Sequence, residues 1–443
     1  MSKAINSKAV NKFKSRFKSR FVQQIMGSFG LRVTYTGCIF LTSIILARFL
    51  GATEFGIYSY TFAWSYLLGV FSTVGLDSLL VREVAVYKTS GNWAMLRGIL
   101  RWANIVSFSC GVAIAICGIA IAWGTGMAQD PPLFTAFCLG MAALPFVALR
   151  NLRRGAMRGL QEVTLGLVPE MLIAPVVILL SILFAFALWR NSLAASWCIA
   201  IYTLVTLATM LISVTLLRKS LPPGVFLIAP QYQIKSWLAS ALPLMLIESI
   251  YVINVRADVL MLGSLRSIAD AGIYVPVNRG AQLINFVLVA VSSALAPQIA
   301  SLYAEGKLDR LQAIVVKTAK AALLPTLVIT ALLIAISPWY LSLFGTEFIQ
   351  GKTALIILCL GQLIFTITGL GGLLLNMTGN EKYTAITGIS GAVLNICLNY
   401  IFISRWGVVG AAIATSISML LMNLGNIILV QHKLKIKSTA IGL

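Results

Sequence analysis

Residues 131–150 read PPLFTAFCLGMAALPFVALR, residues 151–163 read NLRRGAMRGLQEV, and residues 164–188 read TLGLVPEMLIAPVVILLSILFAFAL. The first and third stretches are apolar, and the short stretch between them carries three arginines. A helix needs roughly 20 consecutive apolar residues to cross the hydrocarbon core of a bilayer. This part of the chain therefore predicts two membrane-spanning helices joined by a basic connection.

The same alternation continues along the chain and predicts an all-α, polytopic membrane protein. Only 11% of the residues are charged, against roughly 25% in an average soluble domain, which excludes a soluble enzyme. The net charge of +21 would suit nucleic acid, but basic residues also orient membrane proteins, so no nucleic-acid partner is expected. We predict about twelve spans, at residues 24–47, 57–80, 101–123, 131–150, 164–188, 193–217, 238–262, 273–299, 317–337, 353–376, 383–404 and 408–431.

The positively charged residues fall mostly on one side of this predicted topology. With the N-terminus in the cytoplasm, 26 of the 34 Lys and Arg residues lie on the cytoplasmic side, five lie outside, and three lie within spans. Cytoplasmic connections are the ones that favour Lys and Arg. Both termini are therefore predicted to be cytoplasmic.

The ends of the chain and its reactive side chains indicate little chemistry of their own. Residues 1–23 are basic, and they either lie on the cytoplasmic lipid surface as an amphipathic segment or only enforce topology. The seven cysteines fall within apolar spans without paired spacing, and the single histidine, His432, follows the last span. We predict no disulfide framework, no metal site and no cofactor.

Two short motifs indicate an internal repeat. Leu50-Gly51 precedes Gly56-Ile57-Tyr58, Leu262-Gly263 precedes Gly272-Ile273-Tyr274, and the two Gly-Ile-Tyr runs lie 216 residues apart. Six predicted spans separate the copies, so both halves have the same orientation. Two parallel six-helix lobes around a central cavity are typical of transporters. The expected parts are a cytoplasmic tail (1–23), a first lobe (24–217), a cytoplasmic linker (218–237), a second lobe (238–431) and a second tail (432–443).

Charged residues inside the first five spans are candidates for function. A charge near the bilayer centre costs at least about 2.5–3.5 kcal/mol on insertion scales. Arg32 and Asp77 lie in the cytoplasmic parts of the first two spans, where they either act in transport or form an ion pair between the two helices. Glu170, between Pro169 and Pro175 in the fifth span, is a further candidate.

The seventh span carries the richest set of polar residues. Glu248 lies near its middle, and Asn254, Arg256 and Asp258 follow toward the outer face. Glu248 has no cation within four residues on its own helix, so it is hard to explain as half of a local ion pair. A carboxylate held in a low dielectric suits a proton-coupling or gating role.

The eighth and eleventh spans add polar groups. Arg279, Gln282 and Asn285 enter span eight at three-residue steps, which keeps them within one broad face. An Asp258–Arg279 ion pair is the packing alternative for those two residues. Asn395 and Asn399 lie one turn apart in span eleven, and hydrogen bonding between helices is favoured over ligand binding for them.

Several runs of sequence follow one another in an order that is familiar from one family. They are Ala47-Arg48-Phe49-Leu50-Gly51 with Phe55-Gly56-Ile57-Tyr58, Gly75-Leu76-Asp77 with Arg82-Glu83, Leu242-Pro243-Leu244, Asp258-Val259-Leu260-Met261-Leu262-Gly263 with Ala271-Gly272-Ile273-Tyr274, Leu343-Phe344-Gly345-Thr346-Glu347-Phe348, Asn395-Ile396-Cys397-Leu398-Asn399, and Gly407-Val408-Val409-Gly410-Ala411-Ala412-Ile413-Ala414-Thr415. Together these runs resemble the polysaccharide flippases of the O-antigen and teichuronic type. The resemblance covers nearly the whole chain, and that family shares a superfamily with multidrug/toxin extruders and lipid II flippases. Those relatives often carry additional spans, whereas this chain has no clear thirteenth or fourteenth.

The resemblance implies a lipid-linked cargo. It implies that the chain moves an undecaprenyl-diphosphate-linked oligosaccharide across a bacterial cytoplasmic membrane, for the assembly of O-antigen, capsule or exopolysaccharide. Membrane lipids and, further, the glycan polymerase and chain-length machinery are the partners to consider. A diphosphate needs desolvated cations, and arginine suits bidentate phosphate contacts. We therefore assign substrate binding to Arg32, Arg256, Arg279, Asn254, Gln282 and Asn285, and coupling or gating to Glu248, Asp77, Asp258 and Glu170.

Three other functions remain open. A multidrug extruder of the same superfamily would favour an acidic cavity for cationic drugs, whereas here three arginines accompany four carboxylates inside the predicted spans. A membrane polymerase or ligase would need a large external loop with catalytic residues, and the longest external connection here is about fifteen residues, 338–352. A binding scaffold without transport is the third possibility.

Overall fold

The apolar stretches fold as helices, because a helix satisfies its backbone hydrogen bonds within the segment and can therefore lie in lipid. The computed structural model describes residues 2–188, 194–368 and 370–436. The side chains of residues 1–26, 28 and 29 lie outside the described part, as do residues 437–443, so the expected lipid-surface role of residues 1–23 and much of the second tail remain predictions.

Every regular element among the described residues is helical. The α-helices are α1 (Ser2–Thr73), α2 (Leu76–Thr89), α3 (Trp93–Gly124), α4 (Pro131–Ala142), α5 (Leu144–Gly159), α6 (Val163–Val168), α7 (Ala174–Leu188), α8 (Ala195–Ser220), α9 (Ile234–Leu265), α10 (Ile268–Ala304), α11 (Leu308–Ala335), α12 (Ser337–Ser342), α13 (Lys352–Ile367), α14 (Gly371–Met377) and α15 (Glu381–Leu434). A π-helical turn, η2 (Pro169–Ile173), joins α6 to α7, and short 3-10 turns are η1 (Met127–Gln129), η3 (Val225–Leu227) and η4 (Thr346–Gly351).

Ten helical segments in the described part are long and apolar enough to cross a membrane. Two of them, within α1 and α15, contain a break at a glycine: Gly51 (φ 72°, ψ 177°) and Gly407 (φ 54°, ψ −127°). Glycine adopts such backbone angles without steric cost, so each site can separate two helices without a longer loop. When each broken segment is counted as two, the described residues contain the twelve predicted spans. The chain is an all-α, multi-pass membrane protein.

Several predicted boundaries are wrong, and two of them lie near the charged residues of unit 1. The second span was expected at residues 57–80, but its helix ends at Thr73, and a turn at Val74 and Gly75, both with positive φ, precedes α2. The fourth was expected to end at residue 150, but α5 continues to Gly159. No proline interrupts residues 146–159, so basic residues alone did not end the helix.

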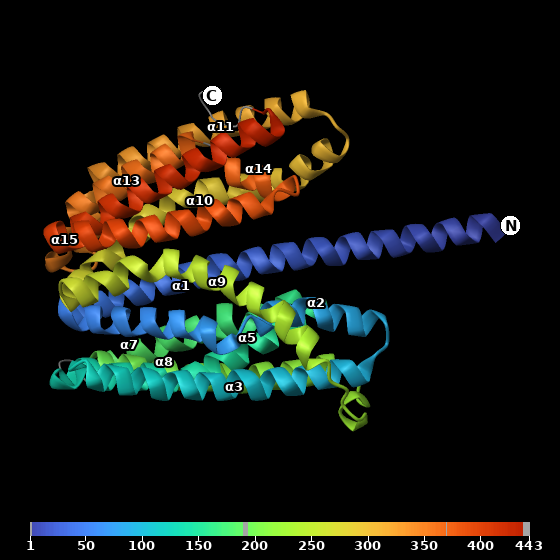
Figure 1. Cartoon of the computed structure of the whole chain (residues 1–443), viewed down its shortest axis with the longest axis horizontal. Coiled ribbons are helices and arrows are strands. Elements are labelled where there is room, and N and C mark those ends of the chain that lie inside the picture. The colour runs from blue at the N-terminus through green and yellow to red at the C-terminus, as the bar shows by residue number, and fades with distance from the viewer. Residues whose placement is uncertain (1, 189–193, 369, 437–443) are drawn as a thin grey trace. The chain divides into compact units, whose positions relative to one another are not determined.

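The chain divides into two compact units. Unit 1 comprises Met1–Thr42 and Leu68–Leu246, and unit 2 comprises Ser43–Leu67 and Ile247–Leu443. Relative to the predicted lobes, the hairpin around Gly51 therefore belongs with unit 2, and the first part of α9 belongs with unit 1. In Figure 1 the blue-to-green helices α2, α3, α5 and α8 belong to unit 1, and the orange-to-red helices α11, α13 and α15 belong to unit 2.

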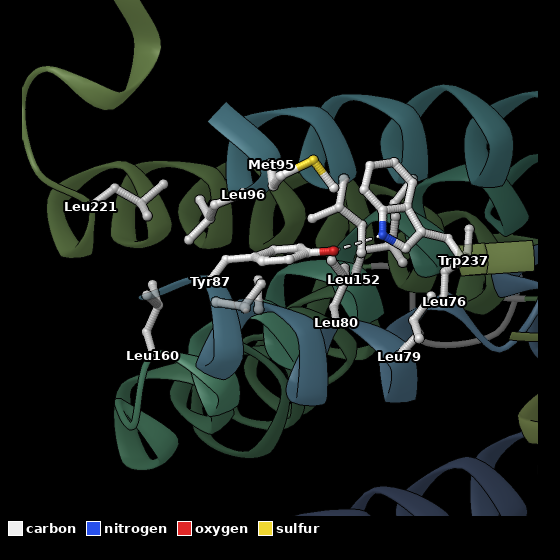
Figure 2. Packing of buried hydrophobic residues seen from close by; sticks show 14 of the residues in the cluster. Leu76, Leu79, Leu80, Tyr87, Met95, Leu96, Leu152, Leu160, Leu221 and Trp237 are labelled. Carbon is white, nitrogen blue, oxygen red and sulfur yellow. Dashed lines mark hydrogen bonds between the residues drawn. The ribbon is translucent and has the colours of Figure 1, made fainter. Parts of the chain in front are cut away.

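The core of unit 1 lies between α2, α3, α5 and the start of α9 (Figure 2). Trp237 on α9 is almost fully buried among leucines, and its indole N–H donates to the Tyr87 hydroxyl on α2 at 2.9 Å. The start of α9 also crosses the turn at Gly75, where an added Cβ would lie 2.6 Å from the backbone nitrogen of Met245. Aromatic burial and backbone contact together fix this half of α9 in unit 1.

The core of unit 2 is formed by α10, α11, α14 and the end of α15, through buried residues that include Leu288, Leu311, Leu374 and Val430. The hairpin segment, residues 43–67, joins this unit at the end where α9 passes into α10. Its helix resumes after Gly51, and α10 begins at Ile268, after Ser267. Ser267 lies 216 residues after Gly51, so the helix starts follow the repeat predicted from the motifs.

Candidate functional site

A buried carboxylate lies at the centre of the polar residues in unit 2. Asp258 on α9 is 5% exposed, and its Oδ2 accepts hydrogen bonds from the Tyr274 hydroxyl on α10 at 2.5 Å and from the Thr415 hydroxyl on α15 at 2.7 Å. Its Oδ1 accepts from the Asn399 amide nitrogen on α15 at 2.7 Å. Asn399 also donates to Asn395 Oδ1 at 3.0 Å. We call these five residues the Asp258 cluster.

The Asp258 cluster surrounds a carboxylate with oxygen-bearing, neutral side chains. The three side chains that donate to Asp258 carry no charge, so its hydrogen bonds do not neutralise it in the way that an arginine would. A second buried oxygen, Asn399 Oδ1, has no hydrogen-bond partner in the described structure. A buried carboxylate beside unsatisfied oxygen is suited to take up a proton or a small hard cation.

An arginine lies on aromatic faces two residues before Asp258. The Arg256 guanidinium is 4.7 Å from the centroid of the Tyr66 ring and 5.5 Å from that of Phe62. Phe62 stacks between its neighbours on the hairpin helix, with ring centroids 6.2 Å from Tyr58 and 6.4 Å from Tyr66. The row of rings follows the four-residue spacing of one helix face, and cation–π contact holds the guanidinium there.

A second group of charges lies in unit 1. Arg154 on α5 contacts Glu170 at 2.7 Å and Asp77 at 3.6 Å, so one guanidinium serves two carboxylates. Glu170 projects from the π-helical turn η2, a type of turn that is frequent at functional sites. Arg32 was one of the partners considered for Asp77, but its side chain is exposed, and the partner that Asp77 has in the described structure is Arg154.

Arg150 and Arg154 were missed as candidates because they were counted with the cytoplasmic connection. Arg150 is 9% exposed, and its Nε has no hydrogen-bond partner in the described structure, as is true of Asp77 Oδ1. The available signal was their spacing: two arginines four residues apart, directly after an apolar stretch with no helix breaker, share one face of a longer helix. Tyr274 and Thr415 were missed as hydrogen-bond partners of Asp258 because neither side chain is charged.

The other predicted residues lie on α9 and α10. Asn254 donates to the backbone oxygen of Ile250, one turn earlier on its own helix, at 3.0 Å. The exposed Gln282 side chain donates to Asn278 Oδ1 at 3.4 Å. Glu248, Arg279 and Asn285 are half-buried on α9 and α10, in unit 2. Among the side chains that are described, no three His, Cys, Asp or Glu gather as a metal site would need.

Comparison with known proteins identifies the family of this chain. The family described as "Polysaccharide biosynthesis protein" matches residues 27–303, more than half of the chain. The chain belongs to this family. A second family, MatE, matches residues 243–401. No protein of curated function matches this chain in sequence.

Solved structures show what the fold of this family member resembles. A multidrug resistance MATE family transporter of the MOP superfamily, in an inward-facing conformation, has a TM-score of 0.74 at 14% identity, over 91% of this chain and 94% of that one. The lipid II flippase MurJ in an inward closed conformation has a TM-score of 0.65 at 15% identity, over 93% and 87%. A MOP superfamily transporter from Pyrococcus furiosus has 0.61 at 14%, over 93% and 94%. The fold is therefore that of membrane transporters and flippases.

Proposed function

We propose that this chain is an alternating-access flippase that moves undecaprenyl-diphosphate-linked oligosaccharide from the inner to the outer leaflet of a bacterial cytoplasmic membrane. The match to the polysaccharide biosynthesis family over residues 27–303 carries this proposal. A multi-pass protein of that family can serve glycan assembly by carrying the lipid-linked precursor across the bilayer. The fold shared with the lipid II flippase MurJ supports a lipid-linked cargo, and the predicted topology puts both termini in the cytoplasm.

Arg256 is our principal candidate for the headgroup contact. A diphosphate is anionic, and a guanidinium can donate two parallel hydrogen bonds to it. The rings of Phe62 and Tyr66 hold this guanidinium in one orientation, which lowers the entropy lost on binding. Such aromatic faces can also stack on sugar rings, so the same surface suits both parts of the headgroup.

The first experiment reconstitutes the full chain in liposomes with lipid-linked oligosaccharide and follows the arrival of glycan on the opposite leaflet with a lectin. We expect Arg256→Ala to slow transport by about tenfold or more, because a hydrogen bond to a charged group contributes about 1.5–3 kcal/mol. Arg405→Ala is the matched control, since Arg405 is exposed. Equal rates for the two variants and wild type would remove Arg256 from the headgroup site.

The Asp258 cluster supports coupling of transport to a proton or a sodium ion. We expect Asp258→Asn, which keeps the shape but removes the charge, to abolish the dependence of transport on an imposed ion gradient. Transport driven only by the cargo gradient should persist. The measurement compares initial rates with and without a proton or sodium gradient, and a gradient response retained by Asp258→Asn would exclude this residue.

The MatE match over residues 243–401 favours one rival, a multidrug extruder. An extruder of cationic drugs would use Asp258 as a counter-charge for the drug, whereas a flippase would use Arg256 for an anion. The rival predicts that cells lacking this chain become drug-sensitive while glycan export continues. Our proposal predicts the opposite pair of results.

A further inference from the structure

The two copies of the Gly-Ile-Tyr motif pack directly against each other within unit 2. A Cβ on Gly56 of the hairpin helix would overlap the backbone oxygen of Ile268, and a Cβ on Gly272 of α10 would overlap that of Ala52. Ile268 lies 216 residues after Ala52, as Gly272 does after Gly56. Each copy thus makes the same contact with the other, as in a two-fold interface.

The two glycines allow the helices to meet backbone to backbone. A Cβ on Gly272 would lie only 2.9 Å from the Gly56 Cα, closer than real Cβ contacts come. Small residues permit such close crossings between membrane helices, where packing contributes much of the association energy. We call the contact among Ala52, Gly56, Ile268 and Gly272 the glycine clasp.

A carboxylate contacts the Ala52 side of the glycine clasp. The Glu347 Oε2 of η4 accepts a hydrogen bond from the Ala52 backbone N–H at 2.8 Å, at the point where the hairpin helix resumes after Gly51. A carboxylate at a helix N-terminus satisfies an N–H that has no partner inside the helix, and it complements the helix dipole. In the other copy the residue 216 positions before Glu347 is Pro131, which has no carboxylate.

Aromatic packing adds to this one-sided attachment. Phe55, next to Gly56, is 1% exposed, and its ring meets that of Phe348 edge to face at 5.9 Å between centroids. Phe348 directly follows Glu347 in the chain, so η4 provides both the carboxylate and the ring. The crossing is symmetric, while the attachment to η4 is not.

We propose that the glycine clasp opens whenever the transporter exposes its cargo to the outer side, and that Glu347 is the latch that biases it toward the closed state. This inference rests on the proposed function, because an alternating-access cycle needs an outer contact that breaks and re-forms. The predicted topology puts the Gly51 turn, the α9–α10 turn and η4 on the outer side. Opening breaks one half-buried hydrogen bond and separates two backbones, without unfolding either helix.

The test measures the clasp without any cargo. Spin labels at Thr53→Cys and Leu265→Cys, both exposed positions beside the clasp, report its opening by pulsed electron resonance in lipid nanodiscs. The full chain is used, with its seven native cysteines replaced by alanine. We expect Glu347→Ala to raise the ratio of open to closed molecules by about twofold to tenfold, the range for one net hydrogen bond. Glu347→Gln, whose amide oxygen still accepts, should change it less.

Two matched controls separate the latch and the crossing from general effects. Asp130 accepts from the Leu133 N–H at the start of α4 in unit 1, so Asp130→Ala removes the same kind of contact from a different helix start. Gly388 on α15 has open space around it, so Gly388→Ala is the control for Gly272→Ala, which should open the clasp. Unchanged distances in both Glu347→Ala and Gly272→Ala would overturn the proposal. If the distances respond but wild type moves no lipid-linked oligosaccharide, the proposed function fails and the clasp remains.

Discussion

At the scale of single residues, the buried carboxylates described above have either a charged partner or only neutral hydrogen-bond donors. Arg154 in unit 1 neutralises Asp77 and Glu170 directly. Asp258 in unit 2 receives hydrogen bonds from Tyr274, Thr415 and Asn399, which carry no charge. A buried ion pair mainly avoids an uncompensated charge. A buried carboxylate with neutral donors has a protonation or ion-binding state that can change, and this makes the Asp258 cluster the better candidate for coupling.

The two ion pairs of Arg154 in unit 1 predict that its removal destabilises the protein. Arg154→Ala leaves two carboxylates, whose side chains are 11% and 21% exposed, without their shared cation. We expect a loss of about 3 kcal/mol in the free energy of unfolding, by analogy with other buried pairs that lose one partner. Arg153→Ala is the control, because Arg153 donates only to the Leu149 backbone on its own helix in the described structure. Equal thermal midpoints for the two variants in detergent would contradict this account.

The sequence identified the candidate residues better than their partners. Asp77, Glu170, Arg256 and Asp258 stood out because each is a charge inside an apolar stretch. Their partners come from distant parts of the chain: Asn399 lies 141 residues from Asp258, and Thr415 lies 157 residues away. No spacing rule links such positions, so only the packing of α9 against α15 reveals the cluster.

At the scale of helices, apolar length predicts the spans, and glycine decides where they break. Gly51 and Gly407 interrupt α1 and α15 within otherwise continuous helices. One error occurred where charge was taken as the end of a helix: α5 continues past Arg150, and Arg154 on this continuation contacts two carboxylates. A hydropathy pattern reports contact with lipid, so it does not distinguish a buried, paired arginine from an exposed one.

The close approach of α5 to α2 predicts that a larger residue between the two helices lowers stability. A Cβ on Gly155 would overlap the backbone oxygen of Asp77. We expect Gly155→Ala to lower the free energy of unfolding by about 1–3 kcal/mol, the usual cost of overpacking, because α5 must move away from α2. Gly388→Ala is the control, and we expect it to be neutral or slightly stabilising, since the site has room for a methyl group. Identical thermal midpoints for both variants would contradict the close packing.

At the scale of the whole molecule, two tripeptides predict a repeat, but they do not predict the division of the chain into its two units. The 216-residue offset predicts which helices correspond, and the helix starts after Gly51 and Ser267 follow it. The assignment of the hairpin, residues 43–67, to unit 2 depends on backbone contacts at Gly56 and Gly272 that the motif does not specify. Sequence correspondence states which parts are alike, whereas packing decides which parts hold together.

The proposed function of this chain is to carry a lipid-linked oligosaccharide across the membrane. The most direct measurement is the amount and leaflet of this lipid in cells that lack the chain, with wild type or Arg256→Ala supplied in return. We predict that the lipid accumulates on the cytoplasmic side, that wild type clears it, and that Arg256→Ala clears it much more slowly. Normal glycan export in the absence of the chain, together with increased drug sensitivity, would contradict the claim and favour an extruder.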